Sequence, residues 1–351
     1  MIEFKLPSLG ADMEEGKLLQ WKVKPGDRVK RGDLVAVVET PKAAVDIEIW
    51  QDGVVRELVT QPGETVPVGT VMARLTQPGE AFVAPKAGEI PSRKAASPAA
   101  RKRASEMGVD LDKLAGSGPH GAVTAEDVEK AAKPAAPVDR NAEMRKAIAA
   151  AMSRSKREIP HYYLAERVPL ARAAAWLEAQ NARRALPERM LMAVLFLKAV
   201  ALACRTCPDM NGHYVDNAFR PAASVQVGVA ISLRQGGLIA PAIHEAETLP
   251  LPDLMKKLAD LVQRARAGSL RSSEMSGPTI TVTNLGDGGV ETVFGVIYPP
   301  QVALVGFGRV VREPVPQVVA SLAADHRVSD GHRGAAFLAE IARRLQQPEA
   351  L

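Results

Sequence analysis

Hydrophobic and polar residues at the start of the chain alternate with the period of two that is typical of β-strands. The stretch GKLLQWKVKPGDRVKRGDLVAVV, from Gly16, aligns with GVVRELVTQPGETVPVGTVMARL, from Gly53, at an offset of 37 residues throughout. Pro-Gly pairs and single glycines stand at matching positions in both copies, and such residues favour tight turns that reverse a β-chain. Residues 1–76 are therefore predicted to form two similar half-sheets packed together, as a small all-β sandwich or flattened barrel.

The pattern changes after this first domain. Residues 77–96 and 132–141 are rich in Ala and Pro without a sustained apolar period, a composition that favours extended linkers. Between them, residues 97–131 are predicted to contain two short helices, the second of which begins at Thr124 as N-cap with Asp127 three residues later. A segment this short buries little apolar surface, so we expect a miniature helical domain.

Residues 142–351 contain longer elements that alternate between helical and strand periods, which predicts an α/β domain with a mixed sheet. The absence of a GxGxxG motif and of a P-loop argues against a dinucleotide-binding or nucleotide-binding fold. The most apolar run, LMAVLFLKAVALAC at 191–204, is interrupted by Lys198 and is too short to cross about 30 Å of hydrocarbon. It is predicted to be a buried helix, and no membrane association is expected.

Charge and cysteine content narrow the function classes. The formal net charge of +5 admits acidic protein partners or a phosphorylated cofactor, but no constellation of basic and aromatic residues favours nucleic acid. The two cysteines, Cys204 and Cys207, form a CxxC, for which core thiols are favoured over a redox pair or half of a zinc site. No metal site is expected.

The first residues lack the charged and apolar regions of a signal peptide, so a cytoplasmic protein is expected.

Two positions in this pattern suggest chemistry. Lys42 follows Pro41 in VVETPKAAVDIEI, at the crossover between the two matched halves of the first domain, where a rigid turn would present it. By itself such a lysine is ordinarily a solvated turn residue. His326 follows the apolar run VVASLAA within DHRVSDG, with Asp330 four residues on, so an imidazole and a carboxylate are expected at a strand end. Six histidines are present, and any one of them alone is more often structural than catalytic.

The lysine turn resembles that of the lipoyl domain in dihydrolipoamide acyltransferases, the core subunits of 2-oxo acid dehydrogenase complexes. The Glu-(Thr/Ser)-Asp-Lys-Ala turn of that family appears as ETPKA at 39–43, with Pro41 in the place of the usual acidic residue. The resemblance implies that Lys42 carries lipoate through an amide. Biotinyl domains share this architecture but usually place Met on both sides of the lysine, so lipoate is favoured over biotin.

Residues 97–131 resemble the peripheral-subunit-binding domain of the same family, whose signatures appear as GVDL and GSGP. The resemblance implies that a basic face of this domain binds the 2-oxo acid decarboxylase component or dihydrolipoamide dehydrogenase. Arg101, Lys102 and Arg103 fit that face, and a solvated charge run is the alternative interpretation. Ala122 stands where the family commonly has arginine, so the affinity for the partner is expected to differ.

The third region resembles the acyltransferase domain of the family, whose DHRxxxG signature matches residues 325–331. The resemblance implies an α/β fold like that of chloramphenicol acetyltransferase. It also implies that His326 is the general base that takes the proton from the thiol of coenzyme A, so that the sulfur attacks the acyl thioester on dihydrolipoamide. Thr283, in the place of the family's usual serine, would stabilise the oxyanion through its hydroxyl. Asp330 would position the site through ionic or hydrogen-bonding contacts.

Together the resemblances predict an enzyme that transfers an acyl group between dihydrolipoamide on its own lipoyl domain and coenzyme A, as the core of a 2-oxo acid dehydrogenase complex. Acetyl is favoured, as in a pyruvate dehydrogenase complex, while succinyl, branched-chain and acetoin-derived acetyl groups stay open. The alternative is a lipoyl carrier or scaffold with weak or absent transferase activity. In the family the catalytic domain is a trimer with active sites between subunits, and the short C-terminal segment favours a homotrimer over a larger cage.

Arg101→Ala is predicted to weaken capture of the peripheral enzymes, because it removes one charge from the basic face. The measurement is a pull-down of the decarboxylase and of dihydrolipoamide dehydrogenase by the full-length protein. Unchanged retention of both enzymes would show that this face does not bind them.

Overall fold

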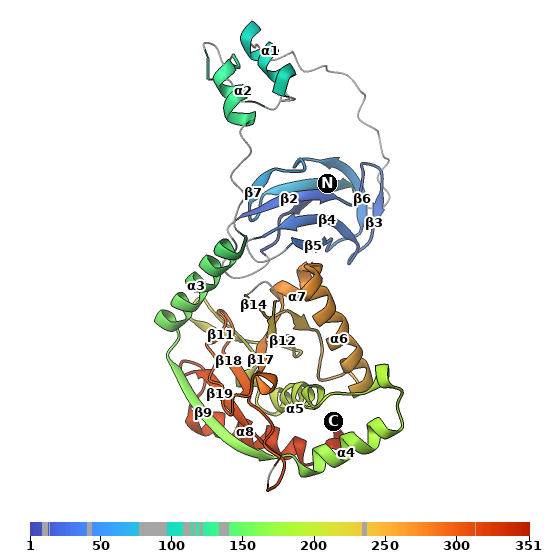
Figure 1. Cartoon of the computed structure of the whole chain (residues 1–351), viewed down its shortest axis with the longest axis vertical. Helices are drawn as coiled ribbons and strands as arrows, with labels where there is room; N and C mark the ends of the chain where they lie inside the picture. The colour runs from blue at the N-terminus through green and yellow to red at the C-terminus, as the bar shows by residue number, and fades with distance from the viewer. Residues whose placement is uncertain are drawn as a thin grey trace. The chain divides into compact units, whose positions relative to one another are not determined.

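The structure of the protein is a computed structural model, drawn in Figure 1. The residues that it describes are 1–8, 13, 15–40, 44–76, 97–107, 114, 117–118, 122–132, 140–233, 237–312 and 314–351. The chain divides into two compact units. One combines residues 1–82 with residues 141–351, and the other consists of residues 83–140.

Some of the sequence-based predictions concern residues outside the described ranges. They are Lys42 with Pro41, the GVDL signature, the linker 77–96 and all but the ends of the linker 132–141. At those ends the helices extend further than predicted, because α2 (Ala125–Ala132) and α3 (Arg140–Glu158) each reach into the second linker.

The first 76 residues fold into two antiparallel sheets. One sheet has the strand order β1-β8-β6-β3, and the other contains β5-β4-β2-β7. The strands are β1 (Ile2–Lys5), β2 (Glu15–Trp21), β3 (Arg28–Val29), β4 (Leu34–Glu39), β5 (Ala44–Glu48), β6 (Gly53–Leu58), β7 (Thr65–Pro67) and β8 (Val71–Thr76). Equivalent strands of the two sequence copies begin 37 or 38 residues apart. Each copy places two strands in one sheet and its short strand in the other. The predicted repeat and the all-β domain are confirmed.

Glycines at the turns allow the two copies to match in detail. Gly26 and Gly32 in the first copy have φ values of 99° and 94°, and Gly63 and Gly69 in the second have φ values of 94° and 86°. Glycine adopts these left-handed values without the steric cost that a Cβ atom would bring. The turns allow alternate apolar side chains of both sheets to meet in one core. Its largest fully buried members are Leu6, Leu18, Ile47, Met72 and Leu75.

The second unit packs α1 (Pro98–Met107) against α2. Among the described residues of this unit, the buried core side chains are Ala100, Ala104, Val123 and Val128. These small side chains remove little apolar surface from water, so polar interactions are expected to add to the stability of this unit.

Asp127 provides that polar support. Its carboxylate accepts hydrogen bonds from the N–H and the hydroxyl of Ser117 at 2.9 and 2.7 Å. It also accepts from the N–H and the hydroxyl of Thr124, both at 2.9 Å. The Thr124 oxygen in turn accepts the N–H of Asp127 at 3.3 Å, so the predicted capping arrangement is confirmed. The Ser117 N–H is the largest reason why the pKa of Asp127 lies far below its ordinary value.

The third domain is built on a six-stranded mixed sheet with the order β15-β12-β17-β18-β19-β9. Within it β12, β17 and β18 run parallel, and the other neighbours pair antiparallel. The strands are β9 (His161–Pro169), β12 (Val227–Val229), β15 (Ala242–Ile243), β17 (Ile280–Asn284), β18 (Ala303–Phe307) and β19 (Gln317–Asp325). β9 and β19 are far apart in the sequence yet lie side by side over their full lengths (Figure 1).

Helices and short hairpins surround this sheet. The helices are α4 (Ala171–Ala182), α5 (Met192–Thr206), α6 (Leu251–Ala267), α7 (Ser272–Ser276) and α8 (Gly331–Leu345). The remaining strands are β10 (Gly212–Val215), β11 (Ala218–Pro221), β13 (Ile231–Ser232), β14 (Leu238–Ile239) and β16 (Leu270–Arg271). Of these, β16 pairs parallel with β5 and so extends the second sheet of the first domain.

Helix α5 is buried over most of its length, as the sequence predicted. Its Phe196 ring stacks on Phe307 of β18 with the ring centroids 4.3 Å apart. Lys198 is buried as well, and its ammonium donates to the carbonyls of Glu247 at 2.6 Å and Leu249 at 2.7 Å, which satisfies the charge inside the core. No helix in the described part of the chain is both long and apolar enough to cross a bilayer.

Cys204 and Cys207 are free thiols buried at the end of α5. Burial is the largest reason why the pKa of each thiol is raised above its ordinary value. Both side chains belong to the main apolar core of the domain. The CxxC therefore has the environment of core thiols, which is the interpretation that the sequence favours.

Asp127→Asn is expected to destabilise the second unit, because an amide turns an NH₂ donor toward groups that are themselves donors. Hydrogen exchange of the full-length protein should become faster across α1 and α2 and stay unchanged in the six-stranded sheet. Since the folded pKa is lowered, the stabilisation is present above the ordinary carboxyl value of 3.8 and is lost as the pH falls below it. The exposed neighbour Glu126→Gln is the control. Unchanged exchange in Asp127→Asn would contradict this role.

Candidate active site

His326 is the first residue after β19. Its N–H donates to the carbonyl of Pro160 at 3.0 Å, immediately before β9. The side chain is exposed, and the imidazole packs edge-on against Tyr162 with the ring centroids 5.3 Å apart. The Tyr162 hydroxyl is in turn hydrogen-bonded to Ser329 at 2.8 Å. The imidazole therefore lies at a strand end, as predicted, and Tyr162 limits its movement on one side.

Three other histidines use a ring nitrogen to hold the fold together. His161, His213 and His244 each have a hydrogen-bonding partner in the protein, at 3.2, 3.0 and 2.8 Å respectively. Within the described ranges of the chain, by contrast, no group hydrogen-bonds to the imidazole nitrogens of His326. An exposed ring with unengaged nitrogens can exchange a proton with a bound ligand.

A buried carboxylate shapes the turn that carries His326. Asp325 is 0% exposed and accepts hydrogen bonds from the Arg327 N–H at 2.9 Å and from the Arg327 guanidinium at 2.6 Å. The hydrogen bonds to Asp325 are also the largest reason why the pKa of Arg327 is raised. The sequence analysis predicts a positioning role for Asp330 and none for Asp325. The position of Asp325, directly before His326 at the end of an apolar run, could have indicated that its carboxylate is buried and positions the turn.

Asp330 acts in the structure as the N-cap of α8. Its side chain accepts the N–H of Arg333 at 2.9 Å, and this bond is the largest reason why the pKa of Asp330 is lowered. His326 contributes a smaller electrostatic lowering of the same pKa. Asp330 thus fixes the point at which α8 begins after the histidine turn.

Thr283 lies level with the middle of β19, whereas His326 lies just beyond the end of that strand. It is half-buried on β17, and its register partners along β18 and β19 are Gly306 and Ser321. Asp325 is four residues beyond Ser321 on β19. A rise of about 3.3 Å per residue and a strand spacing of about 4.8 Å separate the Cα atoms of Thr283 and Asp325 by about 16 Å. Within one chain the structure therefore does not bring Thr283 and His326 together.

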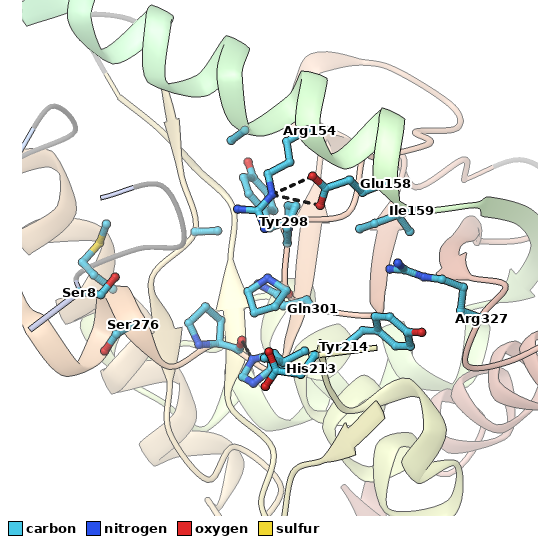
Figure 2. A pocket seen from close by; sticks show the side chains of 18 of the residues that line it. Ser8, Arg154, Glu158, Ile159, His213, Tyr214, Ser276, Tyr298, Gln301 and Arg327 are labelled. Carbon is cyan, nitrogen blue, oxygen red and sulfur yellow. Dashed lines mark hydrogen bonds and ion pairs between the residues drawn. The ribbon is translucent and has the colours of Figure 1, made fainter. Parts of the chain in front are cut away.

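A cavity of about 710 Å³ lies beside the histidine turn. Figure 2 shows Arg327, Tyr214 and His213 among its lining residues, together with Arg154 and Glu158, which form an ion pair on α3. The ion-pair distance is 3.1 Å, and the Arg327 guanidinium lies over the Tyr214 ring at 3.9 Å from its centroid. A cavity of this size can hold a cofactor-sized molecule, and Arg327 of the histidine turn lines it, whereas His326 and Thr283 do not.

The chain matches three known families, one for each of its domains. Residues 136–351 match the family described as 2-oxoacid dehydrogenases acyltransferase (catalytic domain). Residues 2–75 match the family described as Biotin-requiring enzyme, and residues 94–129 match the e3 binding domain. The chain belongs to the 2-oxo acid dehydrogenase acyltransferase family, and it is an acyltransferase.

Individual relatives agree over almost the whole chain. The dihydrolipoyllysine-residue acetyltransferase component of the pyruvate dehydrogenase complex of Rhizobium meliloti is 33% identical over 99% of this chain and 98% of its own length. The corresponding component of the acetoin cleaving system of Bacillus subtilis is 29% identical over 100% of this chain and 99% of its own. A solved structure of a probable dihydrolipoamide acetyltransferase from Listeria monocytogenes, 27% identical, covers 62% of this chain and 96% of that one with a TM-score of 0.56. The predicted family, its three kinds of domain and the fold class are confirmed.

Asp325→Asn is expected to lower the free energy of unfolding by about 1–3 kcal/mol, because a buried amide cannot accept all the hydrogen bonds that the Arg327 N–H and guanidinium donate to the carboxylate. Transferase activity should fall with it, since the turn that carries His326 loses its anchor. Urea unfolding and an acyl-transfer assay measure the two effects.

Asp209→Asn is the matched control for Asp325→Asn. Asp209 also forms a two-point ion pair with an arginine, Arg333, at 2.8 and 2.9 Å, but that arginine side chain is 48% exposed. The control should cost at most about 1 kcal/mol. Equal effects of the two substitutions would show that the Asp325 pair has no special part in the histidine turn.

Proposed function

We propose that this acyltransferase moves an acetyl group between dihydrolipoamide on its own lipoyl domain and coenzyme A, as the core of a pyruvate dehydrogenase complex. The names of the Rhizobium meliloti and Bacillus subtilis relatives both specify acetyl, and the former specifies the complex. The structural observation that carries the proposal is the exposed His326 ring, whose nitrogens are unengaged by the described residues. Exchange of an acyl group between two thiols needs a base at this kind of position.

Lys42 is the proposed attachment site of lipoate. The strands that flank it, β4 and β5, remain paired up to Glu39 and Ala44. Residues 40–43 therefore join two strands of fixed register, which fits a single lysine that must be presented to several enzymes. Lipoate attached there supplies the thiol that carries the acyl group. The protein's part is to hold the attachment point on a rigid domain.

His326 acts as the general base of the proposed reaction. It takes the proton from the thiol of coenzyme A, whose sulfur bonds to the acyl carbon, and it returns the proton to the sulfur that leaves. Negative charge develops on the carbonyl oxygen of the thioester, and the Thr283 hydroxyl donates a hydrogen bond to it. Asp325 and Arg327 hold the turn in place, so the imidazole does not have to be ordered during the reaction.

Each complete site is formed by two copies of the chain, and a homotrimer accounts for this arrangement. The sheet register supports the proposal, because a separation of about 16 Å across one sheet is far beyond the reach of a hydrogen bond. One copy contributes His326 from the end of β19, and its neighbour contributes Thr283 from the end of β17.

The second unit is the proposed binding site for dihydrolipoamide dehydrogenase and the decarboxylase. Its match to the e3 binding domain supports the first of these partners. On α1, Arg101 and Lys102 are exposed and have no side-chain partner among the described residues, whereas Arg103 forms an ion pair with Glu129 at 2.9 Å. We therefore assign the partner contacts chiefly to Arg101 and Lys102.

His326→Ala is expected to reduce acyl transfer from acetyl-coenzyme A to free dihydrolipoamide by about 10²–10⁴-fold, because the reaction loses its base. Lipoylation of Lys42 should stay intact, as measured by the mass of the purified protein, since that modification occurs on a different domain. Turnover equal to that of the wild-type enzyme would rule out the mechanism. The same assay on the wild-type protein distinguishes an active transferase from a lipoyl carrier without transferase activity.

Mixing two inactive variants tests whether the site is shared between copies. His326→Ala and Thr283→Ala subunits, unfolded together and refolded as mixed oligomers, should regain activity, because some interfaces then combine an intact His326 with an intact Thr283. Each variant refolded alone is the control. Activity that stays at the level of the controls would place both groups of a site in one chain.

A further inference from the structure

The first domain and the acyltransferase domain are joined by a strand pair. Strand β16 runs parallel to β5, with Leu270 opposite Val45 and Arg271 opposite Asp46. In the five-stranded sheet β16-β5-β4-β2-β7, β16 occupies the outer position beside β5. Without β16, β5 would be an edge strand with unpaired backbone groups, which is the kind of surface that recruits a further strand. We propose that residues 270–276 form a docking surface that reversibly captures the lipoyl domain of the same chain through its β5 edge.

Side chains extend the contact beyond the two paired residues. The Glu48 N–H donates to the Ser272 hydroxyl at 3.1 Å, and the Ser273 N–H donates to the Glu48 carboxylate at 3.3 Å. Glu48 is only 8% exposed, and among the described residues its carboxylate hydrogen-bonds to Ser273 alone. Burying a carboxylate without a hydrogen-bond donor costs free energy. The two bonds of Glu48 therefore favour this one register of the contact.

Met275 provides the apolar part of the contact. It is half-buried and packs against the core of the lipoyl domain as well as the core of the acyltransferase domain. It is the one residue that the structure, in the part of the chain that it describes, assigns to the margins of both cores. Methionine suits this position because its flexible thioether side chain can adapt to a domain that binds reversibly.

The docking surface is held in shape by the acyltransferase domain itself. The Glu274 carboxylate binds the guanidinium of Arg264 on α6 at 2.5 and 2.6 Å and also accepts the Arg271 N–H at 2.9 Å. The side chain of Leu270 is fully buried in the acyltransferase core. None of these interactions involves the lipoyl domain, so the surface is preformed and little entropy is lost when the lipoyl domain docks.

The contact is small enough to be reversible and lies close to the carrier lysine. Among the described residues it comprises two backbone register pairs, two further hydrogen bonds and one shared methionine, which is far less than a stable interface between separate proteins requires. Tethering within one chain raises the effective concentration enough to populate such a contact. Docking starts at Val45, three residues after Lys42. Ser8 of the lipoyl domain and Ser276 then both line the cavity that contains Arg327 (Figure 2).

An introduced cysteine pair tests the docking surface without using transferase activity, so the outcome is independent of the proposed function. Asp46→Cys with Arg271→Cys places two thiols on register partners, whose Cα spacing suits a disulfide. Mild oxidation of the full-length protein should give a cross-link within one chain, seen as a mobility shift on a non-reducing gel. The native thiols are buried and do not compete. The control pair is Glu57→Cys with Arg271→Cys, because Glu57 lies in the other sheet of the lipoyl domain.

Equal cross-linking in the two pairs, or a cross-link between chains, would overturn the proposal. Adding Met275→Asp to the first pair should slow disulfide formation by about tenfold, since a charge replaces the shared apolar contact. Met275→Leu is the matched control and should keep the rate. If Met275→Asp fails to fold, Glu48→Ala carries the same expectation from the lipoyl side. An unchanged rate in a folded variant of either kind would show that this surface does not hold the domain.

Discussion

The active-site region depends on one buried charge, the carboxylate of Asp325. A carboxylate without solvent exposure has to be paired, and the only charged side chain that pairs with it among the described residues is that of Arg327. The carbonyl of the same residue accepts the N–H groups of Val328 and Ser329, so the chain after β19 closes into a turn. His326 stands in this turn, the Arg327 guanidinium is kept over Tyr214 at the cavity, and α8 follows directly.

The pairing register of the six-stranded sheet determines how far apart the candidate site residues of one chain lie. Register pairing fixes Thr283 level with the middle of β19 and His326 just beyond its end. The register does not slip, because a shift by one residue would turn every core side chain to the other face. The distance between His326 and Thr283 of one chain is therefore fixed by the fold. The proposal that two copies share a site follows from this distance.

Local patterns allowed much of the fold to be predicted. The repeat and its turn glycines, the cap between Thr124 and Asp127 and the buried helix α5 all depend on residues close together in the sequence. Two features could not be predicted in this way. Asp325 and Asp330 flank the same histidine, and the depth of β19 in the sheet decides which one is buried. Strand β16 has only two residues, which is too short for a periodic pattern, and its partner lies more than 200 residues earlier.

The exchange of short strands between the two halves of the lipoyl domain has a mechanical consequence. Strand β3 of the first copy belongs to the sheet built from the second copy, and β7 of the second belongs to the sheet built from the first. Neither half can complete its sheet or cover its apolar face alone, so partial unfolding of one half exposes the other. The domain is therefore expected to fold and unfold as a single cooperative body.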